Sequence, residues 1–255
     1  MHFGKLDRFG IKKPLEHSSS TKEATNMNAN ADAWELYAQS YDRILPVLPF
    51  YQDAVDRHVQ ALKESGAELI LDAGAGTGNV TIKLLELGIS VVALDSSPPM
   101  LQRLEAKLKN ANIKNAVVQN ENVECLKQFK DNSFGAINLL LALYAMDRPR
   151  DALHELIRVL RTGGAIVLTE PCKEFNLQVL IDFVEEFLNT SHTRQSLLTD
   201  WERVLRANLV LDPSKRQQRL SVEEISELLS AQGFSIINSQ ESHLGNCSTI
   251  TAIKQ

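Results

Sequence analysis

The sequence predicts an α/β fold: a doubly wound, mostly parallel sheet of seven strands, the last one antiparallel. Short apolar runs alternate with helical patterns between residues 69 and 170, which is typical of a parallel sheet with helices on both faces. The chain ends on two strand-like runs joined by a short segment, which favours an antiparallel hairpin. With 255 residues, 44% of them hydrophobic, the chain can bury the core of one such domain with an appendage.

Each predicted element has a local signal. Strands are apolar runs, and helices repeat their apolar residues every three to four positions. Gly88 and Gly233 end helices, whereas Pro98 sits in a first helical turn, where proline is tolerated. The predicted strands cover residues 69–72, 90–95, 116–119, 134–141, 165–170, 234–239 and 248–253. The helices between them cover residues 79–87, 97–110, 151–160 and 222–232.

The chain divides into three regions. Residues 1–30 are polar and mixed, and we expect a poorly ordered tail. Residues 31–66 carry two helical patterns, the first with aromatic residues at helical spacing. The core covers residues 67–255. Within it, residues 174–220 interrupt the alternation with two further helices and no strand between them.

Composition excludes several classes of function. A net charge of −5 and a pI near 5.7 give no support for binding nucleic-acid phosphates. The three cysteines are widely spaced, which indicates reduced thiols and no metal site. No apolar run approaches the ~18 residues of a membrane span, and the N-terminus lacks the apolar core of a secretory signal. We therefore expect a cytoplasmic protein that does not bind membranes.

The most informative segment is a glycine turn between two predicted strands. Asp72 precedes glycines at 74, 76 and 78, and Asp95 ends the following strand. Glycine lets the backbone approach a ligand closely, and an acid at a strand tip can hold both ribose hydroxyls. Asp72 would repel a pyrophosphate but attract an ammonium group. The segment predicts a ligand with a nucleoside and a cation rather than a dinucleotide.

Motifs in a fixed order extend this pattern. They read LDAGAGTG at 71–78, LDSSPPML at 94–101, DNSFGAI at 131–137 and ELIRVLRTGGAIVLTEP at 155–171. With them the chain resembles the class I S-adenosylmethionine-dependent methyltransferases, in the small-molecule branch called type 11 or type 25. The resemblance covers residues 34–171. It implies a Rossmann-like methyltransferase fold, with the N-terminal helices as a lid and the helical insert on the substrate side.

The resemblance also implies S-adenosylmethionine as cofactor, S-adenosylhomocysteine as product, and roles for individual residues. Asp95 would hold the ribose hydroxyls, and Asp72 would lie near the amino group, through water. Tyr41 would cover the methionyl part. Glu121 would accept from the adenine amino group, with Glu124 as its rival. The implied cofactor-binding residues are Tyr41, Asp72, Gly74, Ala75, Gly76, Gly78, Asp95, Ser96, Met100, Glu121, Asn122, Val123, Leu140 and Leu141.

Simpler roles stay open for some of these residues. Asp95 could be a helix N-cap, Met100 could belong to the core, Tyr41 could pack the lid helix, and Glu121 could be a solvated loop acid.

Methyl transfer is an in-line displacement that needs alignment and exclusion of water, but neither a metal nor a covalent intermediate. Tyr144, just after the fourth strand, is a candidate for positioning the substrate. His192 and His243 are the candidate general bases. Asp147 and Glu170 could suggest a metal, but no further ligand pattern accompanies them, so we expect none.

The expected acceptor is a small, partly apolar metabolite, methylated on O, N or C, and the expected state is a monomer or homodimer. No N/D-P-P-Y sequence follows the fourth strand, which disfavours the methylation of DNA bases or protein glutamine. The alternatives are a protein or peptide methyltransferase, a non-catalytic cofactor-binding regulator, and a nicotinamide-dependent oxidoreductase.

Overall fold

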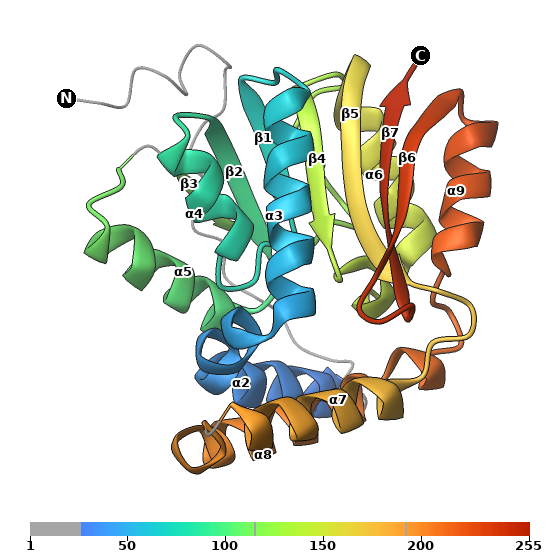
Figure 1. The fold of residues 1–255 in the computed structure, drawn as a ribbon. Coiled ribbons are helices and arrows are strands. Elements are labelled where there is room, and N and C mark those ends of the chain that lie inside the picture. Colours follow the sequence, from blue (N-terminus) through green and yellow to red (C-terminus); the bar gives the residue numbers. More distant parts are fainter. Residues whose placement is uncertain (1–26, 115, 192) are drawn as a thin grey trace.

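A seven-stranded sheet forms the centre of the molecule in the computed structural model, which describes residues 27–114, 116–191 and 193–255 (Figure 1). The strand order is β3-β2-β1-β4-β5-β7-β6, and β7 is antiparallel to both of its neighbours while the other pairs are parallel. This confirms the predicted fold class. The strands are β1 Leu69–Ala73, β2 Ser90–Asp95, β3 Val117–Asn120, β4 Phe134–Leu140, β5 Leu160–Pro171, β6 Phe234–Ser242 and β7 Cys247–Lys254.

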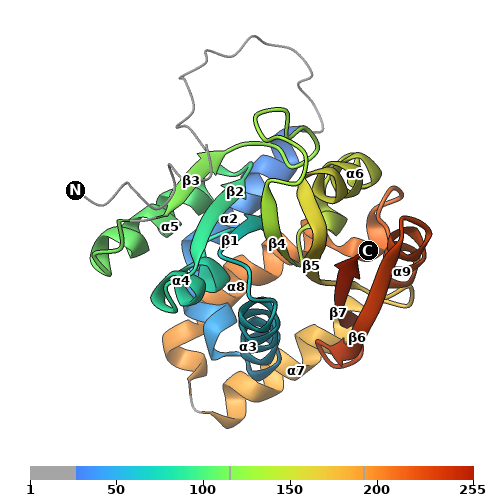
Figure 2. The ribbon, with the colours of Figure 1, turned by 90° about the horizontal axis from the view of Figure 1, so that it is seen from above.

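Helices cover both faces of the sheet (Figure 2). One face carries α3 (Pro49–Glu64), α4 (Asn79–Glu86) and α5 (Pro98–Asn110). The other carries α6 (Pro149–Val159) and α9 (Val222–Ala231). Each face has its own apolar core. Strand β1 contributes to both cores and is buried along its whole length, as expected for a central parallel strand.

Strand β1 pairs with β2 on one side and with β4 on the other. The strand order therefore reverses direction beside β1, and the loops after β1 and β4 leave toward opposite faces. In open α/β sheets, ligands bind in the crevice outside the carboxyl ends of the strands at such a switch point. The fold thus directs attention to the ends of β1, β2 and β4.

Three helices lie across this carboxyl edge: α2 (Met27–Ile44), α7 (Leu177–Thr190) and α8 (Arg194–Leu211) (Figure 1). The buried Ser40 hydroxyl on α2 donates to Asp200 Oδ1 on α8 at 2.7 Å. Segments from opposite ends of the chain thus form one layer, which we call the lid.

Some expectations differ from the structure. Helix α2 begins at Met27, inside the region expected to be a tail; the expectation for residues 1–26 lies outside the described residues. Only the first of the two N-terminal helices belongs to the lid. Helix α3 packs on the sheet, because its apolar side includes Val55 and Leu62, both buried in the core of that face.

Residues 161–164, between the predicted helix at 151–160 and the predicted strand at 165–170, are part of β5, where the pairing with β4 shifts register. Among the described residues, no helix is both long and apolar enough to span a bilayer.

Candidate functional site

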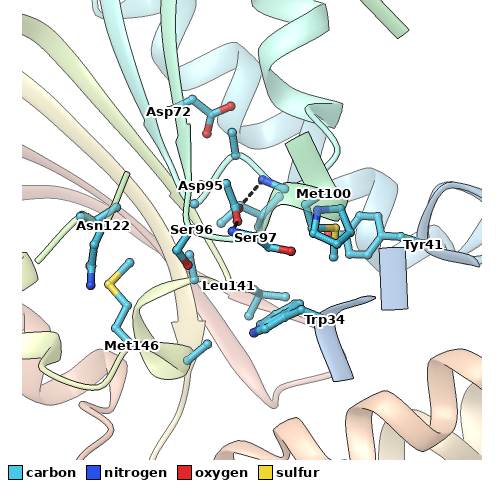
Figure 3. Close-up of a pocket in the computed structure, with 18 of the residues that line it drawn as sticks. Trp34, Tyr41, Asp72, Asp95, Ser96, Ser97, Met100, Asn122, Leu141 and Met146 are labelled. Carbon is cyan, nitrogen blue, oxygen red and sulfur yellow. Dashed lines mark hydrogen bonds between the residues drawn. The ribbon is translucent and has the colours of Figure 1, made fainter. Parts of the chain in front are cut away.

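A cavity of about 990 Å³ opens at the carboxyl ends of β1, β2 and β4, between the sheet and the lid (Figure 3). It is lined by all the cofactor-binding residues implied by the sequence except Gly78. Those residues come from five separate segments of the chain. The structure therefore brings together side chains that the sequence could relate only through motifs.

Asp95 lies at the centre of this cavity, held by the backbone on both sides (Figure 3). Gly76 N–H donates to its Oδ2 and Ser97 N–H to its Oδ1, each at 2.8 Å. Ser97 is the N-cap of α5, so Asp95 does not occupy the cap position. Burial raises the pKa of Asp95, and the two N–H bonds oppose that rise. Each carboxylate oxygen retains a further lone pair for a ligand.

The glycines of the turn have different tasks. All have positive φ, at +73° for Gly74, +54° for Gly76 and +82° for Gly78. A Cβ on Gly74 would overlap the Cβ of Ala142, in the loop after β4, whereas a Cβ on Gly76 would meet nothing. A Cβ on Gly78 would overlap Leu104 of α5. Gly78, expected to line the methionyl part, is instead needed for helix packing and lies outside the cavity lining.

Replacing Gly74 with alanine should therefore destabilise the fold more than the same change at Gly76. Both variants force alanine to a positive φ, at a cost of ~1–2 kcal/mol. Only Gly74→Ala adds overpacking, typically ~1–3 kcal/mol. Urea unfolding of the two variants compares them directly. Equal loss of unfolding free energy would contradict the close approach of Gly74 to Ala142.

Asp72 belongs to a chain of buried polar side chains that are joined by hydrogen bonds. It accepts from Thr81 Oγ1 and, at 2.7 Å, from Asn138 Nδ2. Asn138 Oδ1 lies 2.6 Å from His58 Nδ1, and His58 Nε2 lies 2.7 Å from Thr169 Oγ1. Since Asn138 uses its amide N–H on Asp72, its oxygen accepts from His58, and His58 Nε2 accepts from Thr169.

Burial lowers the pKa of His58 to about 4, so the ring is neutral. Burial also raises the pKa of Asp72. Sequence reasoning missed this chain; the only signal was Asn138, a polar residue within an apolar strand.

Glu121 and Glu124 are the two candidates for the acid that accepts from the adenine amino group. Both line the cavity, but Glu124 is buried and accepts from Arg148 N at 2.8 Å and from Arg148 Nε at 3.0 Å. Glu121 is half-buried, and its backbone N–H donates to Asp95 O at 3.2 Å. The described residues give its carboxylate no hydrogen-bond partner. The geometry thus favours Glu121 over Glu124 as the acid free to meet a ligand.

Tyr41 faces the cavity as part of an aromatic cluster that sequence analysis only partly found (Figure 3). Its hydroxyl lies 3.0 Å from that of Tyr51, which also accepts from Asn79 Nδ2 at 3.1 Å. Lys107 Nζ bonds both Asn79 Oδ1 (2.8 Å) and the lid residue Asp42 (2.7 Å). These contacts tie the lid to the start of α4. Burial raises the pKa of Tyr41 well above its usual range.

Glu170, fully buried at the end of β5, shapes the loop after β4. Its carboxylate accepts from the backbone N–H groups of Ala142 (3.0 Å), Leu143 (2.7 Å) and Tyr144 (3.0 Å). Burial raises its pKa to about 7, against the effect of those bonds. Within the described ranges, no three His, Cys, Asp or Glu side chains gather as metal ligands.

The raised pKa of Glu170 predicts an unusual pH dependence. The folded state holds a proton between pH 4.5 and about 7 that the unfolded state has lost. This contribution to stability is full below pH 4.5 and is lost as pH rises through 7. As pH rises from 4.5 to about 7, the unfolding free energy of the wild type should fall by about 3 kcal/mol relative to that of Glu170→Gln. Urea unfolding between pH 5 and 8 measures it, with the exposed Glu105→Gln as control. If the difference in unfolding free energy between the wild type and Glu170→Gln stayed constant over this pH range, the raised pKa of Glu170 would be contradicted.

A second, smaller cavity of about 110 Å³ lies beneath the lid, next to the first. The two share Trp34, Tyr41, Tyr51 and Leu141 in their linings. We call it the ring chamber. Its lining consists of Trp34, Tyr37, Tyr41, Leu45, Leu48, Phe50, Tyr51, Leu141, Tyr144, Pro171, Phe175, Leu177, Leu180, Ile181, Val184, Trp201, Val204, Asn208, Leu211, Pro213, His243 and Cys247.

The structure gives the positions of two of the three candidate catalytic residues. Tyr144 and His243 line the ring chamber, whereas His192 lies outside the described residues. Burial raises the pKa of Tyr144, which therefore stays a protonated phenol. Burial lowers the pKa of His243 to about 3, far from the operating pH at which a general base is effective. This argues against the predicted role of His243 as a base.

Comparison with known proteins agrees with the fold and the glycine turn. Residues 71–168 match the family model described as a methyltransferase domain. A demethylmenaquinone methyltransferase of Tropheryma whipplei (strain Twist) is 36% identical over 135 residues, 52% of this chain and 55% of that protein. The ubiquinone/menaquinone biosynthesis C-methyltransferase UbiE of Zymomonas mobilis is 31% identical over 121 residues, 48% of each. The chain thus spans about half the length of these curated relatives.

Among solved structures, magnesium protoporphyrin IX methyltransferase from Synechocystis PCC 6803, with bound S-adenosylmethionine, superposes with a TM-score of 0.62. The match covers 92% of this chain and 100% of that one at 15% identity. The chain therefore shares the fold of this S-adenosylmethionine-binding methyltransferase, and residues 71–168 are similar to a methyltransferase domain. The similarity covers residues 71–168 for the domain and the whole sheet for the fold.

Proposed function

We propose that the protein transfers the methyl group of S-adenosylmethionine to a small, largely apolar metabolite. One observation carries the proposal. The larger cavity, which is lined by the acids Asp72, Asp95 and Glu121, adjoins the mainly apolar ring chamber. Both are lined by Trp34, Tyr41, Tyr51 and Leu141. A cofactor site that contains carboxylates beside a mainly apolar site is the arrangement that methyl transfer to such an acceptor requires.

The larger cavity fits the cofactor by its chemistry. Asp95 offers two fixed carboxylate oxygens to the ribose hydroxyls. Ser96 and Met100 lie beside it for the ribose and adenine, with Glu121 near the adenine amino group. Asp72 supplies an acid near the amino group of the methionyl part. Gly74 and Gly76 leave room for that part, because neither carries a side chain.

When bound, S-adenosylmethionine would supply a methyl group activated by its sulfonium, and Asp72, Gly74 and Asp95 are among the residues that would hold it. The chain contributes alignment, worth up to ~7–11 kcal/mol in favourable cases. The aromatic walls around Tyr41 and Tyr51 exclude water from the junction of the two cavities. Two relatives are named for quinone methylation, which supports an acceptor with a ring.

Two measurements test the proposal. Calorimetric titration should show S-adenosylhomocysteine binding and no comparable binding of NAD. Incubation with methyl-labelled cofactor and a fractionated metabolite extract should yield a labelled small molecule, detected by mass. Binding of NAD but not of S-adenosylhomocysteine would overturn the proposal. Label found only in polypeptide would instead identify a protein methyltransferase.

A further inference from the structure

We infer that the ring chamber binds a single uncharged aromatic ring bearing a hydroxyl group, recognised by Trp201 Nε1 and His243 Nε2. The inference deepens the proposed function, on which it rests, by naming the class of acceptor and two specificity residues.

Polar atoms without partners carry this inference. Trp201 is 5% exposed and His243 is 4% exposed, and both line the chamber. Trp201 Nε1 and His243 Nε2 are fully buried and have no hydrogen-bond partner within the described part of the chain. Buried polar side-chain atoms are normally hydrogen-bonded. Both residues line the same cavity, and a ligand there would supply the partners that these two atoms lack.

The β6–β7 hairpin holds His243 in place. The Nδ1 atom of His243 lies 2.9 Å from Ser242 Oγ. The His243 ring packs against the ring of Phe50, with 5.0 Å between the two centroids. The backbone of His243 and of Leu244 is left-handed, with φ of +50° and +59°. Asn246 fixes this turn by donating to His243 O from both its backbone (3.1 Å) and its side chain (3.3 Å). Backbone strain at a non-glycine residue persists where surrounding contacts enforce it, often at ligand sites.

Size and charge define the ligand. A cavity of ~150 Å³ can hold benzene, so a chamber of about 110 Å³ that shares four lining residues with the larger cavity has room for one ring at most. Among the described residues, its lining contains no Asp, Glu, Lys or Arg, which disfavours a charged group. Trp201 Nε1 can only donate, so the ligand must offer an acceptor. A hydroxyl can also donate, and so suits either tautomer of His243.

Phenol and toluene, which differ by a hydroxyl in place of a methyl, test this recognition in the full-length protein saturated with S-adenosylhomocysteine. The chain has two tryptophans, so Trp34→Phe leaves Trp201 as the single indole N–H signal in a ¹H–¹⁵N spectrum. Phenol should bind at least as tightly as toluene and move that signal downfield. His243→Phe should lose about tenfold in phenol affinity and keep its toluene affinity.

Leu180→Ala is the matched control, because Leu180 lines the chamber and the change alters the shape of the chamber but no polar atom. It should weaken both probes by similar factors. Toluene binding more tightly than phenol in the wild type, or neither probe binding, would overturn the inference. The wild-type comparison decides the question even if His243→Phe does not fold. If the wild-type protein does not bind S-adenosylhomocysteine, that result counts against the proposed function. Phenol and toluene titrations in the absence of S-adenosylhomocysteine then still test the chamber.

Discussion

Replacing Asp95 with alanine should weaken the binding of S-adenosylhomocysteine by about 10- to 100-fold. Hydrogen bonds to a charged group are worth ~1.5–3 kcal/mol each, and this carboxylate is aimed into the cavity by Gly76 N–H and Ser97 N–H. The change also leaves those two donors without their acceptor. Isothermal titration calorimetry measures the affinity, and circular dichroism verifies the fold.

Asp95→Asn provides the graded control for this prediction. The amide retains one oxygen for a backbone donor and loses the charge, so its affinity should lie between those of the wild type and Asp95→Ala. Unchanged affinity in the alanine variant would refute the assignment of Asp95 to the ribose.

Replacing Asn138 with leucine should cost about 3–5 kcal/mol of unfolding free energy. Within the described residues, Asn138 links Asp72 to His58 by hydrogen bonds to both, and Asp72 and His58 are buried. An apolar side chain would leave one carboxylate oxygen and one ring N–H unpaired, and removing one partner from a buried charged network has costs of this size. Guanidinium unfolding measures the loss.

Thr249→Val is the matched control, because Thr249 is at the far end of the same chain of hydrogen bonds. Its hydroxyl lies 2.7 Å from Thr169 Oγ1, and no charge depends on it. The expected loss is about 1 kcal/mol, the value of one neutral hydrogen bond. If Asn138→Leu were as stable as the wild type, the buried chain would contribute no net stability.

The sheet and the cofactor cavity could be foreseen because their signals are local. A parallel strand buried on both faces must be apolar throughout, as β1 is. A tight turn near a ligand requires glycine, as at Gly74 and Gly76. The position of Asp95 at the tip of β2 could be foreseen because Asp95 directly follows the apolar run of that strand. Each of these signals lies within a few residues and depends on backbone geometry rather than on distant partners.

The contacts that shape the rest join distant segments. His58 and Asn138 are 80 positions apart, and Ser40 and Asp200 are 160 apart. No local pattern distinguishes His58 from an ordinary helical histidine, nor Trp201 from a core residue. Gly78 shows the converse error: its motif suggested ligand contact, and only the position of Leu104 reveals that it serves packing.

The sequence by itself determined the class of fold, the order of its strands along the chain and a set of residues that line the larger cavity, Gly78 excepted. The tertiary structure alone decided which helices form the lid, how Asp72 is held, and that His243 and Trp201 meet at one apolar chamber. The physical reason is that backbone and periodicity are encoded by neighbours in sequence. Burial and hydrogen-bond partners depend on which surfaces meet after the chain has folded.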